Sequence, residues 1–135
     1  MPLYQLNPRE LPQVWPVVAP LLQKAIDLDP SSVTIEQVEY SVRTGRTSLL
    51  VWEEPTVGIT GAATVDLIDY PRERIANITL LGGRSVVQQT VFDEVCNWMR
   101  LSGATKAQCW ANGSRVQLYE KMGMKATHQV MRIKL

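Results

Sequence analysis

The hydrophobic residues of this chain change their spacing several times, and the order of these changes limits the folds that it can adopt. Three strand-like runs follow one another with short loops between them, which predicts an antiparallel meander. A longer stretch with helical spacing comes next, and then a short strand, a short helix and a last strand. The runs of the meander are 47–52, 57–68 and 75–81, and the later segments are 85–103, 104–111, 114–121 and 125–135.

The residues before the meander predict a short strand over 3–6 and then a helical region. Asn7-Pro8-Arg9-Glu10 combines an N-cap, a proline at the first helical position and a glutamate at the third. Pro12, Pro16 and Pro20 then recur every four residues. Because an interior proline removes a backbone hydrogen bond, we expect a bent helix or two short ones. The inward residues are expected to be Val14, Val17, Val18, Leu21, Leu22 and Ile26.

Two capping-box patterns mark the starts of two other helices. Thr34-x-x-Gln37 begins a short helix that Gly45 ends, and Ser85-x-x-Gln88 begins the long one. The apolar stripe of the long helix consists of Val87, Val91, Phe92, Val95, Trp98 and Met99. The element order is therefore β-α-α-β-β-β-α-β-α-β, which predicts a single α+β domain over residues 1–135 built around a mixed, mostly antiparallel sheet.

The charge of the chain is nearly balanced overall but unevenly distributed along it. Fourteen Lys and Arg against thirteen Asp and Glu give a net charge of +1, which argues against general nucleic-acid binding. Residues 1–69 hold four basic and nine acidic residues, a net charge of −5, whereas residues 70–135 hold ten and four, a net charge of +6. The two halves are therefore expected to meet ligands or partners of different charge.

The sequence argues against several classes of protein. It has no apolar run near the length of about 20 residues that a membrane span needs, and its first residues do not resemble a signal peptide, so a cytoplasmic location is expected. Cys96, Cys109 and His128 are too few for a disulfide framework, a metal site or a conventional triad, and we expect packing roles for them. Trp110, with Lys106 on the same strand face, is the one hint of nucleic-acid stacking.

The junction at residues 80–86 is the first candidate binding site. Gly82 and Gly83 allow close backbone approach, the free N–H groups of a following helix attract anions, and Arg84 adds a charged fork. The alternative is an ordinary capped helix after a tight turn. Both interpretations stay open at this point.

The second candidate lies at Asn112-Gly-Ser-Arg-Val-Gln-Leu-Tyr-Glu-Lys-Met-Gly-Met124. This stretch resembles the last motif of the GNAT N-acetyltransferase superfamily, in which Asn112, Leu118, Tyr119, Lys121 and Gly123 match at the family's spacing. The element order along nearly the whole chain also looks like that of GNAT proteins, so the resemblance implies a GNAT-like (acyl-CoA N-acyltransferase) fold.

The resemblance also implies roles for individual residues. It implies that acetyl-CoA donates an acetyl group by direct attack of an amine, so that no nucleophilic side chain is needed, and that Tyr119 is the general acid for the departing thiolate. Residues that would hold the pantetheine arm, the pyrophosphate or another part of the cofactor are Thr79, Leu80, Leu81, Gly82, Gly83, Arg84, Ser85 and Asn112. Tyr119 also has a simpler interpretation as a packed tyrosine with a hydrogen-bonded hydroxyl.

The sequence departs from the family pattern at the phosphate loop and at the base. Val86 and Gln88 stand where the family has glycines, so the loop is degenerate and acetyl-CoA binding is in question. The fourth strand lacks the glutamate that is the usual base, and Asp66 or Asp69 on the preceding strand could replace it.

Three functions remain open. The first is N-acetyl transfer from acetyl-CoA to an amine-bearing small molecule or protein. The second is a non-catalytic GNAT-fold protein that acts through protein contacts, as in the small GNAT-like proteins of tailed phages, where a virion-associated location is expected. The third is a homo-oligomer in which the acidic half of one copy meets the basic half of another.

Overall fold

The computed structural model describes residues 3–28, 33–83, 88–111 and 113–135. The strands are β1 (Leu3–Gln5), β2 (Ser48–Glu54), β3 (Gly58–Asp69), β4 (Arg74–Gly83) and β5 (Lys106–Cys109). The helices are the 3-10 helix η1 (Pro8–Glu10), α1 (Leu11–Leu28), α2 (Ile35–Arg43), α3 (Gln89–Leu101) and α4 (Ser114–Lys121). Apart from the last strand, the predicted element order is confirmed.

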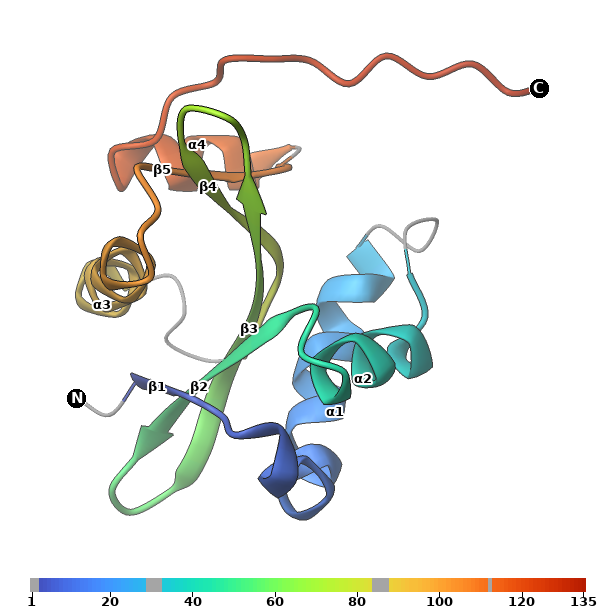
Figure 1. Ribbon diagram of the computed structural model, residues 1–135, viewed down its shortest axis with the longest axis vertical. Helices are drawn as coiled ribbons and strands as arrows, with labels where there is room; N and C mark the ends of the chain where they lie inside the picture. The colour runs from blue at the N-terminus through green and yellow to red at the C-terminus, as the bar shows by residue number, and fades with distance from the viewer. Residues whose placement is uncertain (1–2, 29–32, 84–87, 112) are drawn as a thin grey trace.

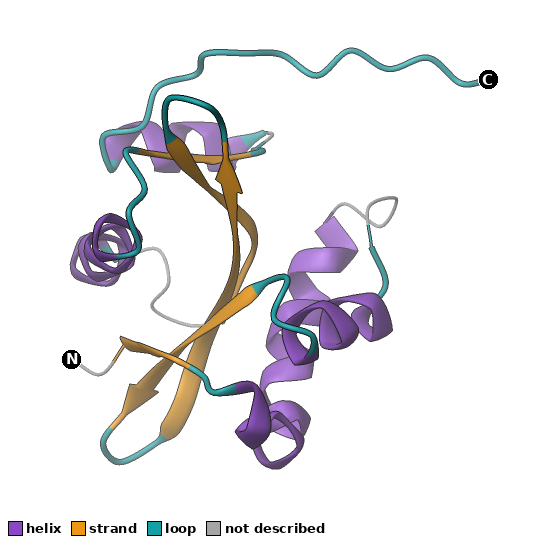
Figure 2. Cartoon of the chain, viewed as in Figure 1, coloured by secondary structure: helices purple, strands orange, loops and turns teal. Residues whose placement is uncertain are grey.

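The five strands form one sheet in the order β1-β2-β3-β4-β5 (Figures 1 and 2). Neighbouring strands are antiparallel except β4 and β5, which are parallel. Short turns join β2 to β3 and β3 to β4, whereas β4 reaches β5 through α3 (Figure 1). This is the mixed, mostly antiparallel sheet that the sequence predicts.

Helices cover both faces of the curved sheet, so the domain has three layers (Figure 1). Helices α1 and α2 lie on one face over a core that includes Val18, Leu22, Val42, Leu49 and Val51. Helix α3 lies on the other face, over a core of Leu50, Ala63, Val65, Ala76, Ile78, Val95 and Met99. The alternation of β2 and β3 side chains between the two cores fixes the sheet between the helical layers.

The helical region after β1 is a short 3-10 helix, η1, followed by the single helix α1, so of the two expected forms the structure has one helix and not two short ones. The N-cap prediction is confirmed, because Asn7 Oδ1 accepts a hydrogen bond from the N–H of Arg9 at 3.0 Å. Pro16 and Pro20 lie inside α1 and are exposed. Val17 is also exposed, which corrects its predicted place in the core.

The second helix begins as predicted and the third does not. Thr34 and Gln37 form both bonds of a capping box at the start of α2. Helix α3 begins at Gln89, and its N-cap, Gln88, lies three residues after the predicted cap and makes no side-chain capping bond. Ser85, the predicted cap, lies outside the described residues.

Two irregularities in the sheet create the space for a site. The register between β3 and β4 shifts between Thr64 and Val65, so that Thr79 is the extra residue of a bulge opposite them. Beyond Ile78 of β4 and Cys109 of β5 the two parallel strands no longer pair. The sheet therefore opens between β4 and β5 on the side where β4 continues to Gly83.

The last predicted strand, residues 125–135, is not formed. The segment is fully described, has no assigned secondary structure, and is exposed at every residue. Figure 1 shows it leaving α4 and running past the loop between β3 and β4, away from the body of the protein. A strand needs a neighbour to bond its backbone groups, and here the segment runs beside none. No helix in the described ranges is long and apolar enough to cross a membrane.

Candidate active site

A cavity of about 310 Å³ opens where β4 and β5 separate. One wall comes from β3 and β4, a second from α1 and α2, and a third from the end of β5 together with α4. The lining includes Gln37, Ser41, Thr47, Thr64, Asp66, Asn77, Thr79, Leu80, Leu81, Cys109, Trp110, Arg115 and Tyr119. Residues from both candidate segments of the sequence therefore meet around one volume.

The edge of β4 facing this cavity lacks a partner strand. On its other side β4 pairs with β3 as far as Gly83, but β5 pairs with β4 only up to Ile78. Thr79, Leu80 and Leu81 thus line the cavity at a point where the sheet has no neighbour among the described strands. An extended ligand that carries amide groups can add to such an edge as a strand does.

The side chain of Thr79 is held by the bulge. Its hydroxyl lies 2.6 Å from the Thr64 hydroxyl and donates to the Thr64 carbonyl at 3.1 Å. Because the hydroxyl is engaged within the sheet, Thr79 is expected to meet a ligand through its backbone. Thr64 is buried, and this contact fixes the shape of the cavity floor.

Tyr119 reaches the cavity from α4 and is 9% exposed. Burial raises the pKa of its hydroxyl, the nearby Cys109 raises it further, and the cation of Arg115 partly lowers it. The structure shows no hydrogen bond from this hydroxyl to another described residue. A protonated hydroxyl on a buried side chain, with no partner among the described residues, is suited to donate to a ligand.

A row of polar side chains crosses the cavity wall from β2 to β4. Thr47, next to the start of β2, donates to Asp66 Oδ1 at 2.6 Å, and Asp66 is opposite Asn77 in the β3–β4 register. The Oδ1 atom of Asn77 is buried without a hydrogen-bond partner among the described residues. Sequence reasoning missed Thr47, because only the strand register brings it beside Asp66.

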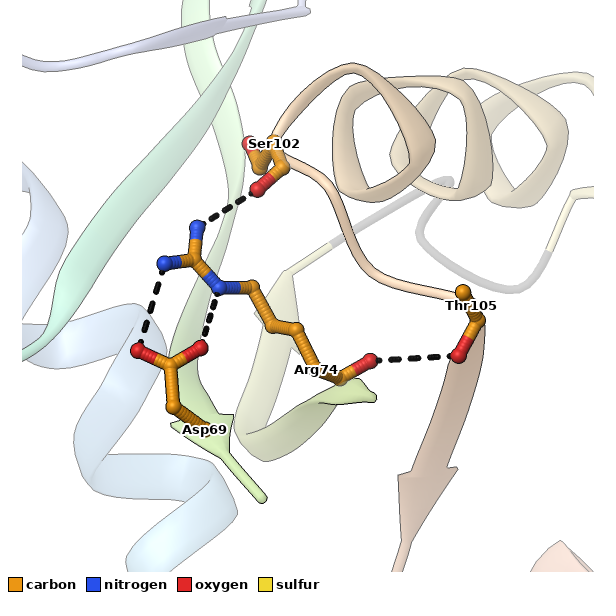
Figure 3. A network of polar contacts seen from close by, with 4 residues as sticks. All are labelled: Asp69, Arg74, Ser102 and Thr105. Carbon is orange, nitrogen blue, oxygen red and sulfur yellow. Dashed lines mark hydrogen bonds and ion pairs between the residues drawn. The ribbon is translucent and has the colours of Figure 1, made fainter. Parts of the chain in front are cut away.

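Asp69 lies outside this cavity and has a different role. Its carboxylate accepts from Arg74 Nε at 2.6 Å and from Nη2 at 3.3 Å, while Arg74 Nη1 donates to the Ser102 carbonyl at 2.7 Å (Figure 3). The hydrogen bond from Arg74 holds the pKa of Asp69 below its ordinary value. Thr105 also donates to the Arg74 carbonyl, so this network ties the start of β4 to the end of α3.

Gly82 and Gly83 are the last two residues of β4, not members of a loop as predicted. A Cβ atom at Gly82 would overlap the carbonyl oxygen of Leu21 in α1, and one at Gly83 would overlap the carbonyl of Thr60 in β3. Gly83 also has a φ of 109°, in the region that favours glycine. Close packing therefore accounts for both glycines without a ligand.

Three of the predicted cofactor-binding residues, Arg84, Ser85 and Asn112, lie outside the described residues. Their predicted roles stay predictions, as does the effect of Val86 in the phosphate loop. Gln88, the other position where the family has glycine, is exposed.

The two cysteines and Trp110, which the sequence also singles out, lie half-buried or at the surface. Cys96 and Cys109 are half-buried free thiols, and burial raises the pKa of each. In the described part of the chain no group of three or more His, Cys, Asp or Glu is arranged to hold a metal ion. Trp110 is 65% exposed at the rim of the cavity, whereas Trp52 is buried in the core.

The fold matches solved acetyltransferase structures over nearly the whole chain. A ribosomal-protein-alanine N-acetyltransferase from Brucella melitensis biovar Abortus 2308 is similar with a TM-score of 0.72, 13% identity and 100% of each chain covered. A glucosamine-6-phosphate N-acetyltransferase from Arabidopsis thaliana is similar with a TM-score of 0.66 and 18% identity. The match covers 98% of this chain and 97% of that chain.

An aminoglycoside acetyltransferase from an uncultured soil metagenomic sample gives a TM-score of 0.72 and 13% identity, covering 99% of this chain and 94% of the other. No family model matches the sequence, and no curated protein matches it. The chain therefore has the GNAT fold, and the predicted fold class and the resemblance to the superfamily are confirmed at the level of the fold.

Proposed function

We propose that this protein is an N-acetyltransferase that moves an acetyl group from acetyl-CoA to an amine. The observation that carries the proposal is the opening between β4 and β5. There the edge of β4 and the hydroxyl of Tyr119 line one cavity, and neither has a partner among the described residues. Both features suit an extended thioester donor. The similar folds named above, all of acetyltransferases, support the same reaction.

The residues along the open edge of β4 fit the pantetheine arm of acetyl-CoA. When bound, acetyl-CoA would supply an activated acetyl thioester. Thr79, Leu80 and Leu81 offer backbone N–H and C=O groups along the open edge of β4. The amides of pantetheine have the spacing of an extended chain and can pair with that edge. The proposed donor site is completed by contacts to the cofactor that the sequence predicts. They are made by Gly82, Gly83, Arg84, Ser85 and Asn112.

Tyr119 acts in this proposal as the general acid. When the amine forms the new C–N bond, the C–S bond breaks and the sulfur is left negatively charged. The Tyr119 Oη donates its proton to that sulfur. Burial raises the pKa of Tyr119, so the hydroxyl stays protonated at neutral pH and is ready to donate.

Asp66 acts as the base and takes the proton that the attacking amine loses. It lines the cavity, accepts a hydrogen bond from Thr47, and lies opposite Asn77, whose unpartnered Oδ1 can accept from the ammonium or amine of the acceptor. Asp69 is bound to Arg74 away from the cavity, so of the two carboxylates predicted from the sequence Asp66 fits the role.

The acceptor in this proposal is an amine on a small molecule or a protein. The wall that faces it combines the carboxylate of Asp66 with neutral polar groups of Gln37, Ser41 and Asn77. Such a wall attracts a cationic ammonium and then accepts its proton.

Isothermal titration with acetyl-CoA tests the donor site, and release of free CoA thiol in the presence of a panel of primary amines tests the reaction. We expect saturable binding and amine-dependent thiol release. A folded sample that gives no heat at high micromolar acetyl-CoA would exclude acetyl transfer and favour the alternative, a non-catalytic GNAT-fold protein that acts through protein contacts.

A further inference from the structure

A second, open groove of about 530 Å³ runs along α2 beside the cavity of the candidate active site. Its lining includes Val33, Gln37 and Ser41, and these three residues also line that cavity. Glu36 and Tyr40, one helical turn apart on α2, line the groove but not the cavity. The groove therefore continues the acceptor side of the cavity along the surface of α2.

Ser41 connects the groove to the proposed base. The N–H of Thr47 donates to the Ser41 carbonyl at 3.1 Å, and the Thr47 hydroxyl donates to Asp66 Oδ1 at 2.6 Å. The inner end of the groove is thus joined by two hydrogen bonds to the carboxylate that would take the proton of the acceptor amine. An acceptor whose amine lies at Asp66 can extend past Ser41 into the groove.

Glu36 is the one charged residue among the described residues that line the groove. Its side chain is exposed and forms no ion pair or hydrogen bond with another described residue. Glu39 on the same helix is paired with Arg43 at 3.8 Å, and Arg43 lies 5.5 Å from the ring centroid of Tyr40. Arg43 is thus already matched by a carboxylate. Glu36 is left as a negative charge beside the apolar surface of Val33 and Tyr40.

We propose that the acceptor is a diamine or polyamine, a flexible methylene chain that carries two or more ammonium groups. This inference rests on the proposed acetyl transfer and narrows its acceptor. The reacting amine lies at Asp66, and the second ammonium pairs with Glu36. The methylene chain between them lies on the apolar surface of Val33 and Tyr40. In the transfer a neutral amine forms the C–N bond and the C–S bond breaks, while Asp66 takes the proton of the nitrogen and Tyr119 gives one to the sulfur.

The distribution of charge around the two spaces favours a ligand of this kind. All of the described residues that line the groove belong to residues 1–69, which have a net charge of −5. Among the described residues that line the cavity, the one cation is Arg115, which belongs to the wall formed by α4. A ligand with a second positive charge is therefore attracted to the groove on the α2 side.

Cadaverine and pentylamine are a matched pair of acceptors, since they share the same carbon chain and only cadaverine has a second ammonium group. Thiol-release kinetics with both amines at saturating acetyl-CoA test the proposal. We expect kcat/KM for cadaverine, after correction for its two equivalent amines, to exceed that for pentylamine by about fivefold. The difference should lie in KM, because the pair with Glu36 forms equally before and during the reaction. Equal values of kcat/KM would overturn the proposal.

Glu36→Gln and Glu39→Gln are matched variants, because both carboxylates lie on α2 and only Glu36 lines the groove. We expect Glu36→Gln to reduce the preference for cadaverine to less than about twofold and to leave kcat for pentylamine unchanged. Glu39→Gln should keep the full preference. Circular dichroism verifies that both variants fold. A preference that survives Glu36→Gln, or that Glu39→Gln abolishes equally, would contradict the assignment.

Binding of cadaverine in the absence of acetyl-CoA separates this inference from the proposed function. We expect cadaverine to shift the backbone amide resonances of Glu36 and Tyr40 in a nuclear magnetic resonance titration, and to shift them less in Glu36→Gln. Turnover of pentylamine without any such shifts would overturn the inference and leave acetyl transfer intact. If no amine released thiol, the proposed function would fail, whereas shifts at Glu36 and Tyr40 would still support a diamine-binding groove.

Discussion

Tyr119 combines three properties that seldom occur in a residue that only packs: it is buried, it lines a cavity, and its hydroxyl has no protein partner in the described ranges. Replacing it with phenylalanine keeps the ring and removes the proton donor. We expect Tyr119→Phe to lower kcat by about 100-fold or more while acetyl-CoA binding changes little. Thiol-release assays measure kcat, and isothermal titration measures acetyl-CoA binding. A loss of kcat below about threefold would assign Tyr119 to packing.

The same residue makes a prediction about pH. Because burial raises the pKa of folded Tyr119 above the value of 10.0 for an exposed tyrosine, its contribution to stability is fully present below pH 10.0 and is lost as the pH rises through the higher folded value. We therefore expect wild-type protein to lose stability above pH 10.0 more steeply than Tyr119→Phe does. Urea denaturation at a series of alkaline pH values measures this difference, and parallel curves would contradict it.

Asp66 and Asp69 form a natural pair of matched variants, since they lie on the same strand and only Asp66 lines the cavity. We expect Asp66→Asn to lower kcat by about 100-fold, because the attacking amine loses its proton acceptor, and to leave acetyl-CoA affinity unchanged. Asp69→Asn should retain activity, since its carboxylate binds Arg74. Steady-state kinetics decides between the two carboxylates, and equal losses would exclude the assignment.

At the scale of elements, the contact between α1 and β4 depends on a missing side chain. The carbonyl of Leu21 lies where a Cβ atom of Gly82 would stand, so α1 approaches the sheet more closely than any other residue would allow. This contact places α1, and with it one wall of the cavity, beside the open edge of β4.

We expect Gly82→Ala to reduce the free energy of unfolding by about 2 to 3 kcal/mol, because backbone must move to remove the overlap. Gly58→Ala is the control: Gly58 has a φ of 93° and nothing within 4 Å of its added Cβ, so it tests backbone strain alone, at about 1 kcal/mol. Urea denaturation measures both values. If Gly82→Ala cost no more than Gly58→Ala, the close approach of α1 would not matter to stability.

Element types were predictable where the signal is local. The capping box at Thr34 fixed the start of α2, and the helix 114–121 was predicted with the bounds that the structure has. Strand 104–111 was predicted too long, and strand 125–135 was wrong, because a strand exists only where a neighbour bonds it, and periodicity does not report the neighbour.

At the scale of the whole molecule, the charge imbalance follows the division of the site. The part with net charge +6 begins just before β4 and includes β4, β5 and α4, which form the proposed donor side. The part with net charge −5 supplies α1, α2 and Asp66. This arrangement suits an anionic donor and a cationic acceptor.

We expect the affinity for acetyl-CoA to fall about threefold or more between about 50 and about 500 mM NaCl, because salt screens attraction between the phosphates and the basic part of the chain. S-acetylpantetheine lacks those nucleotide phosphates, so its affinity should change little over the same range. Isothermal titration of both ligands makes the comparison. An equal salt dependence would place the cause outside the phosphate contacts.

By itself the sequence determined the kinds of element and nearly all of their order, since hydrophobic period, caps and turn residues act over a few neighbouring positions. It also pointed to Tyr119 as a candidate, through a motif that spans residues 112–124. Only the tertiary structure decided that β4 and β5 separate after Ile78, that Thr47, Asp66 and Asn77 form one row, and that Gly82 serves packing. These facts depend on strand register and on the approach of α1 to the sheet, which are set by contacts between residues far apart in the chain.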